Sequence, residues 1–214
     1  MLGHDPIIKP KLRGRMHLVA AGASIIGLIY LVQVAPNTKA LVAAWIYGMG
    51  AVLLYLTSST YHVFARSPRS RWIMQRADHS MIYILIAASF TPTCVLVLGG
   101  TWRWVLLAVV WAGAIGGVLL KLLAMDRYPK IGNSLYIVLG WSGMFALPAL
   151  VQRPTLLGLV FAAGVLYTAG AILFAMKKPT LSPRWFGYHE VWHTFVTAAG
   201  ALLFIANLGL VRAG

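Results

Sequence analysis

Acidic residues are scarce in this chain. Of its 214 residues only four are Asp or Glu, against eighteen Lys or Arg, and charged residues make up 10% of the sequence while hydrophobic residues make up 60%. Soluble globular domains carry about 25% charged residues. This composition excludes an ordinary water-soluble domain and predicts an integral membrane protein. The apolar stretches described below are of helix length, so the expected fold class is all-α.

Cysteine and phosphate-binding motifs are also lacking. Cys94 is the single cysteine, so no intrachain disulfide can form and the residue says nothing about the redox compartment. The sequence contains neither a GxGxxG fingerprint nor a phosphate-binding loop, and nucleotide chemistry is therefore not indicated.

What is abundant is apolar sequence, gathered in seven stretches. They run over residues 16–35, 40–65, 78–100, 104–125, 131–152, 155–176 and 188–211. Each is about as long as a helix rising ~1.5 Å per residue needs to cross ~30 Å of hydrocarbon. We predict seven transmembrane helices in one domain, residues 16–211, after a basic leader, residues 1–15, and before a short tail, residues 212–214.

The basic residues are sorted by side of the membrane. One side holds Lys9, Lys11, Arg13, Arg15, Arg66, Arg69, Arg71, Arg76, Lys121, Arg127, Lys130, Lys177, Lys178 and Arg184, and the other holds only Lys39, Arg103, Arg153 and Arg212. By the positive-inside rule, a multi-pass cell-membrane protein then has a cytoplasmic N-terminus and an outer C-terminus. The basic excess would contact anionic lipid headgroups, and no nucleic-acid partner is required.

Few polar side chains interrupt the apolar stretches, and these few are informative. Ser58 and His62 share a helical face near the end of the second stretch, Asp78 opens the third, and His189 and His193 lie one turn apart at the head of the seventh. The topology places all of them at similar depth near the cytoplasmic leaflet. Three imidazoles on a zinc ion leave a fourth position open, which is the ligand pattern of catalytic zinc, and Asp78 would hydrogen-bond a water there.

The stretches "KPKLRGRMH", "SSTYH", "RADHSMIYILIAASFTP" and "HEVWHTFV" resemble the bacterial hemolysin III family, which is related to the progestin and adiponectin receptors and more distantly to alkaline ceramidases. The resemblance implies a seven-helix fold with a zinc site. It implies that His62, His189 and His193 ligate zinc, that Asp78 holds the water, and that Ser58 supports the site or stabilises an oxyanion. In the ceramidase-like relatives the proposed chemistry is hydrolysis of a lipid amide.

Each site residue also has a simpler interpretation. Histidine pairs one turn apart often bind no metal, and Asp78 could be the N-terminal acid of its helix, where it would be stabilised by the helix dipole. The Ser58 hydroxyl could bond back to a carbonyl of its own helix. Ser59 is an alternative for the supporting role.

Other polar residues are expected outside the site. We expect His79 at the membrane interface, and His17 as a headgroup contact in preference to a supporting partner of the metal ligands. Glu190 is expected to pair with a basic connector residue, and Asp126 to form a solvated ion pair beside Arg127.

Three functions follow from these expectations. The first is a zinc-dependent hydrolase acting on an amide or ester of a membrane lipid. The second is a non-enzymatic regulator or receptor-like protein in which zinc is structural. A pore-forming cytolysin, channel or transporter ranks lowest, because the central portions of the spans carry no ionisable residue and Lys121 can reach the inner surface.

Overall fold

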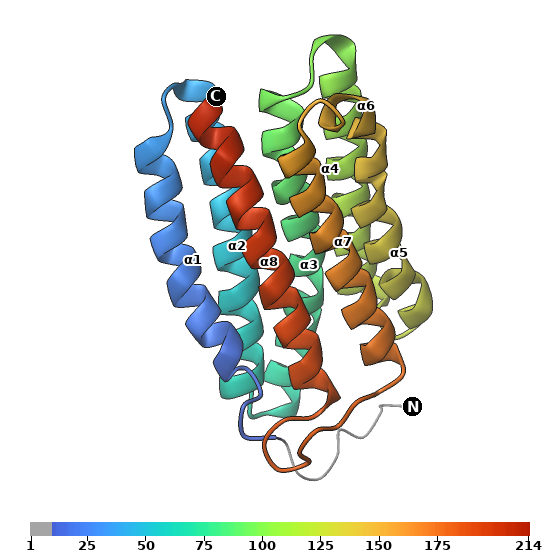
Figure 1. The fold of residues 1–214 in the computed structure, drawn as a ribbon. Helices are drawn as coiled ribbons and strands as arrows, with labels where there is room; N and C mark the ends of the chain where they lie inside the picture. Colours follow the sequence, from blue (N-terminus) through green and yellow to red (C-terminus); the bar gives the residue numbers. More distant parts are fainter. Residues whose placement is uncertain (1–9) are drawn as a thin grey trace.

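The computed structural model describes residues 10–214, and it is helical almost throughout (Figure 1). The elements are α1 (Arg15–Val34), α2 (Thr38–Phe64), α3 (Pro68–Leu96), α4 (Gly100–Ala124), α5 (Pro129–Trp141), the 3-10 turn η1 (Ser142–Ala146), α6 (Leu147–Leu150), α7 (Pro154–Ala175) and α8 (Tyr188–Ala213). Within this part of the chain seven segments are long and apolar enough to cross a membrane. The predicted all-α fold with seven membrane-spanning segments is confirmed.

The fifth span is not one regular helix. It consists of α5, η1 and α6, which together cover Pro129–Leu150. Pro148 lies in the first turn of α6, where its missing N–H costs nothing because that group has no partner inside the helix. The break lies at the end of the bundle away from the beginning of α1 (Figure 1).

The start of α3 differs from the prediction. The sequence pattern placed it at Asp78, whereas the helix begins at Pro68, ten residues earlier. Ser67 and Ser70 form a capping box: the Ser67 hydroxyl accepts from the Ser70 N–H at 3.1 Å, and the Ser70 hydroxyl accepts from the Ser67 N–H at 3.1 Å. Much of the basic segment that was expected to be a connector is therefore helix.

Helix α8 ties the bundle together. Neighbouring helices in the sequence pack against each other, and α8 packs in addition against α1, α2 and α3. The end of α2 and the beginnings of α1, α3 and α8 lie together, at the bottom of Figure 1, while the C-terminus lies at the top. We call the lower end the histidine end, because His62 and His189 lie in the terminal turns found there.

The outer surface of the bundle is apolar. Large hydrophobic side chains point away from the protein, among them Val19, Ile26 and Leu123, which are 75%, 71% and 82% exposed. In water such a surface would favour aggregation. The surface is suited to contact with membrane lipid.

Candidate metal centre

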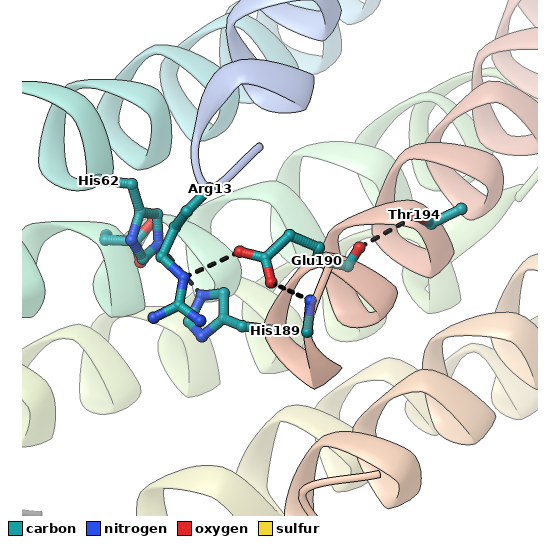
Figure 2. Close-up of polar contacts among 7 residues, drawn as sticks. Arg13, His62, His189, Glu190 and Thr194 are labelled. Atoms are coloured by element: carbon teal, nitrogen blue, oxygen red, sulfur yellow. Dashed lines mark hydrogen bonds and ion pairs between the residues drawn. The ribbon is translucent and has the colours of Figure 1, made fainter. Parts of the chain in front are cut away.

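Three histidines from two helices converge at the histidine end. His62 comes from the last turn of α2, and His189 and His193 come from the first two turns of α8. One ring nitrogen of each lies within 4.8 Å of the others. The Nε2 atoms of His62 and His189 are 3.2 Å apart, and Figure 2 shows the two rings turned toward each other. The three residues could hold a metal ion.

The distance between His62 and His189 suits a tetrahedral site. Two nitrogens bound at about 2.0–2.1 Å to a tetrahedral zinc lie roughly 3.3 Å apart, which is close to the 3.2 Å between His62 and His189. His193 is 2% exposed, and its Nδ1 atom is buried without a hydrogen-bond partner among residues 10–214. A buried nitrogen without a partner is costly, and a cation would remove that cost. The residues present therefore fit a metal ion.

Asp78 lies beside this cluster. Its Oδ2 atom is 3.9 Å from Nε2 of His62, and its side chain is 14% exposed. Because α3 begins at Pro68, Asp78 is about 15 Å along the helix axis from the first residue, far beyond the first turn in which the helix dipole acts. The alternative interpretation of Asp78 as a helix N-terminal acid is wrong.

Ser58 is buried one turn before His62, and its partner comes from α1. The Ser58 hydroxyl lies 2.8 Å from Nδ1 of His17, and the same hydroxyl contacts the Asp78 carboxylate. The alternative of a bond back to its own helix instead describes Ser59, whose hydroxyl donates to the Leu56 carbonyl at 3.0 Å. The structure thus places Ser58, and not Ser59, between His17 and Asp78.

His17 lies inside the bundle and not at the lipid headgroups. It is 3% exposed, and its ring stacks on that of His193 with centroids 3.8 Å apart and an 8° angle between planes. The expectation of a headgroup contact is wrong, and the supporting position that ranked second fits. One sequence pattern indicates that His17 is on a buried face. Ala20, Ala21 and Ser24 follow it at three, four and seven residues and so share its helical face, and such small residues allow close helix packing.

Glu190 and Arg13 form a buried ion pair next to the histidines. Arg13 Nε donates to Glu190 Oε1 at 2.9 Å, and Glu190 Oε2 accepts from the Gly187 N–H at 2.8 Å (Figure 2). The side chains of Arg13 and Glu190 are 4% and 0% exposed. Glu190 does pair with a basic residue, but its partner lies in the leader and not in a connector.

The leader is held across the histidine end. The Lys11 N–H donates to the Arg184 carbonyl at 3.0 Å, and the Leu12 N–H donates to the Trp185 carbonyl at 3.3 Å. We call residues 10–14 the N-terminal strap. Gly14, its last residue, has φ of 79°, and a Cβ atom there would lie 2.7 Å from Cβ of His62. The strap therefore lies directly against a candidate ligand.

Other ionisable residues lie outside the cluster. The Nδ1 atom of His79 is buried without a partner in the described chain, and its carbonyl accepts from the Tyr136 hydroxyl at 2.9 Å, while its expected place at the membrane interface stays a prediction. Asp126 pairs with Arg76 of α3, where a pair with Arg127 was expected.

Lys121 does not reach the surface. It is 1% exposed, and its Nζ donates to Asn133 Oδ1 at 2.8 Å, so it joins α4 to α5.

Known proteins resemble this chain over most of its length. The sequence model of the family described as "Haemolysin-III related" matches residues 6–204. Hemolysin-3 of Bacillus cereus is 36% identical over 197 residues, which are 90% of this chain and 87% of that protein. The Hemolysin-3 homolog of Bacillus subtilis (strain 168) is 32% identical over 197 residues, which are 90% of this chain and 89% of that protein.

A more distant likeness extends to animals. The human monocyte to macrophage differentiation factor is 27% identical over 191 residues, which are 86% of this chain and 76% of that protein. This likeness supports the wider superfamily that includes the progestin and adiponectin receptors. With a family match that spans the strap, the histidine cluster and most of α8, this chain belongs to the haemolysin-III related family and is a multi-pass cell-membrane protein.

Proposed function

We propose that this protein is a zinc-dependent hydrolase that cleaves an amide or ester bond of a membrane lipid. The observation that carries the proposal is the 3.2 Å approach of His62 and His189, with His193 beside them and the Asp78 carboxylate 3.9 Å from His62. Three nitrogen donors with a carboxylate beside them are residues that a catalytic zinc site can use. From the sorting of basic residues we infer that the histidine end faces the cytoplasm.

An apolar cavity supports lipid as the substrate. A cavity of about 540 Å³ lies between α1, α2 and α8, lined mainly by alanine, glycine and leucine. One of its lining residues, Tyr55, has its ring 5.1 Å from the ring of His17, so the cavity comes within one side chain of the site. The Tyr167 hydroxyl also belongs to the lining and is buried without a partner in the described chain, which suits it to a polar group of a bound lipid.

Each residue of the site would have a distinct role in the reaction. His62, His189 and His193 would hold zinc, which supplies Lewis-acid chemistry by polarising a carbonyl group and making a water more acidic. Asp78 would accept a proton from the attacking water and return it to the leaving amine or alcohol as the bond to the carbonyl carbon breaks. Ser58, placed between His17 and Asp78, would orient the carboxylate.

The test of this proposal is lipid hydrolysis by the purified protein in detergent or nanodiscs. Ceramide with a labelled acyl chain is the first probe, and a labelled acyl ester is the second. We expect release of the labelled fatty acid, reduced at least about 100-fold by Asp78→Asn with zinc retained, because general base catalysis contributes on that order. Asp126→Asn is the matched carboxylate control and should leave turnover unchanged.

A second candidate is a membrane regulator in which zinc ties the helices together. The N-terminal strap favours this function. Strap residue Arg13 pairs with Glu190 of α8, next to the candidate metal ligands, so a metal ion there would help to hold the strap, α2 and α8 together. Under this alternative zinc raises the melting temperature of the protein, and no fatty acid is released from either lipid. The release assay therefore separates the two functions.

A further inference from the structure

A second groove lies at the opposite end of the bundle from the histidines. It has a volume of about 500 Å³ and runs between the beginning of α7 and the last turns of α8. Its lining is apolar apart from Arg153, Thr155 and Arg212. Along α8 it extends from Ile205 to Arg212, which is about 10 Å along the helix axis. The groove thus combines an apolar lining with two arginines at the ends of membrane-spanning helices, Arg153 at the beginning of α7 and Arg212 in the last turn of α8.

Basic residues are few at this end of the protein, and half of them lie in this groove. Only four basic residues belong to this side by sequence, and two of them, Arg153 and Arg212, line one groove. The acidic side chains of the described chain, Asp78, Asp126 and Glu190, all lie toward the histidine end, so the groove has no acidic side chain to neutralise its arginines. The guanidinium of Arg212 is positioned by a hydrogen bond to the Tyr30 hydroxyl.

We propose that this groove binds one anionic phospholipid of the leaflet that faces the C-terminus. Its phosphate lies between Arg153 and Arg212, because guanidinium groups bind phosphate oxygens through paired, charge-assisted hydrogen bonds. One acyl chain lies along the apolar lining, where burial of its methylene groups adds affinity. Lipid contact alone is expected of any membrane protein, whereas selection of an anionic headgroup at this groove is not.

This site is independent of the proposed hydrolase. It lies at the end of the bundle away from His62, and its residues touch none of the metal cluster. The lipid bound here is a resident ligand and not the substrate. Ile205 lines both this groove and the apolar cavity near the histidines, so the bound lipid and the cavity would share one lining residue.

The test is retention of phosphatidylglycerol by the full-length protein, followed by native mass spectrometry against phosphatidylcholine of the same chain length. We expect one tightly held phosphatidylglycerol, with affinity reduced about ten-fold or more by Arg153→Gln with Arg212→Gln. Lys39→Gln with Arg103→Gln is the control that removes the same charge from the same side, and it should retain the lipid. Equal losses in both pairs, or equal retention of the two lipids, would overturn the proposal.

A second variant tests the acyl part without changing charge. A Cβ atom at Gly209, which lines the groove, would have no neighbour within 4 Å, so the backbone there accepts a side chain and Gly209→Phe adds bulk at the groove. Gly158→Phe on α7 is the control, since Gly158 has the same open surroundings and does not line the groove. We expect only Gly209→Phe to displace phosphatidylglycerol. If inorganic phosphate stabilises the parent as well as the lipid does, the groove is a simple anion site and the lipid proposal fails.

Discussion

The Nε2 atoms of His62 and His189 lie 3.2 Å apart although 127 residues separate them in the sequence. The approach depends on α2 ending and α8 beginning at the same face of the bundle. Two neutral imidazoles at that distance can share one hydrogen bond. Such a bond needs no further partner, yet His193 and the Asp78 carboxylate lie beside the pair, as they would around a metal ion. Four predictions test how the surroundings support this arrangement.

The first prediction concerns His17. In His17→Phe an aromatic ring still stacks on His193, but the Ser58 hydroxyl loses its 2.8 Å partner. We expect zinc to remain stoichiometric while lipid turnover falls, because Ser58 no longer orients Asp78. Metal content and fatty-acid release measure the two effects. His79→Phe should change neither, and unchanged turnover in His17→Phe would show that the bond to Ser58 has no role.

The second prediction concerns the contact between the strap and a metal ligand. Gly14 has a left-handed backbone, which costs a residue with a side chain about 1–2 kcal/mol, and a Cβ atom there would press against His62. We expect Gly14→Ala to weaken zinc binding as well as stability, measured by competition with a chelator and by thermal unfolding. Gly22→Ala on α1 is the control, since a Cβ atom there meets nothing within 4 Å. Equal zinc affinity in the two variants would contradict the account.

The third prediction concerns the buried ion pair. Glu190→Ala leaves Arg13 buried without its carboxylate, and removal of one member of a buried pair costs about 3–5 kcal/mol. We expect a large loss of thermal stability. Restoration of much of the loss by Arg13→Met together with Glu190→Met would show that the cost comes from loss of the Arg13–Glu190 pair.

A solvent-exposed carboxylate gives the comparison. The side chain of Asp126 is 64% exposed while that of Arg76 is 6% exposed, so solvent screens this pair from the carboxylate side, whereas both members of the Arg13–Glu190 pair are buried. Asp126→Ala should therefore cost less than Glu190→Ala. Equal losses would contradict the structural difference between the two pairs.

The fourth prediction concerns acyl-chain length. Ala51 lines the apolar cavity near the histidines, and Ala51→Leu removes part of its volume. We expect turnover of long-chain lipid to fall more than turnover of short-chain lipid, measured on a labelled series. Ala112→Leu, at an exposed position of α4, should preserve the parent's preference. A shared loss at every chain length would show that the cavity does not hold the chain.

The sequence was sufficient for the spans and for the histidine set, for a clear physical reason. Long apolar runs and one-turn histidine spacing are local patterns, so they survive without tertiary information. The start of α3 could not be predicted from hydropathy, because the basic segment before Asp78 resembles a connector. Only the Ser67–Ser70 capping box marks it as the beginning of a helix.

The partners of the site were harder to predict. In a helix that is apolar on all sides, as α1 is, hydropathy does not reveal which face is buried, and His17 was therefore assigned to the headgroups. The pairing of Arg13 with Glu190 depends on how the strap crosses the bundle, and no local pattern encodes that path. Both contacts join segments that are far apart in the sequence, so only the structure shows them.

Zinc X-ray absorption on the purified, metal-loaded protein tests the central claim most directly. The account predicts about one zinc per chain, coordinated by three imidazole nitrogens at about 2.0–2.1 Å, with the imidazole signal reduced by His62→Ala and unchanged by His79→Ala. A protein that binds no zinc, or one whose zinc signal survives loss of His62, would contradict it.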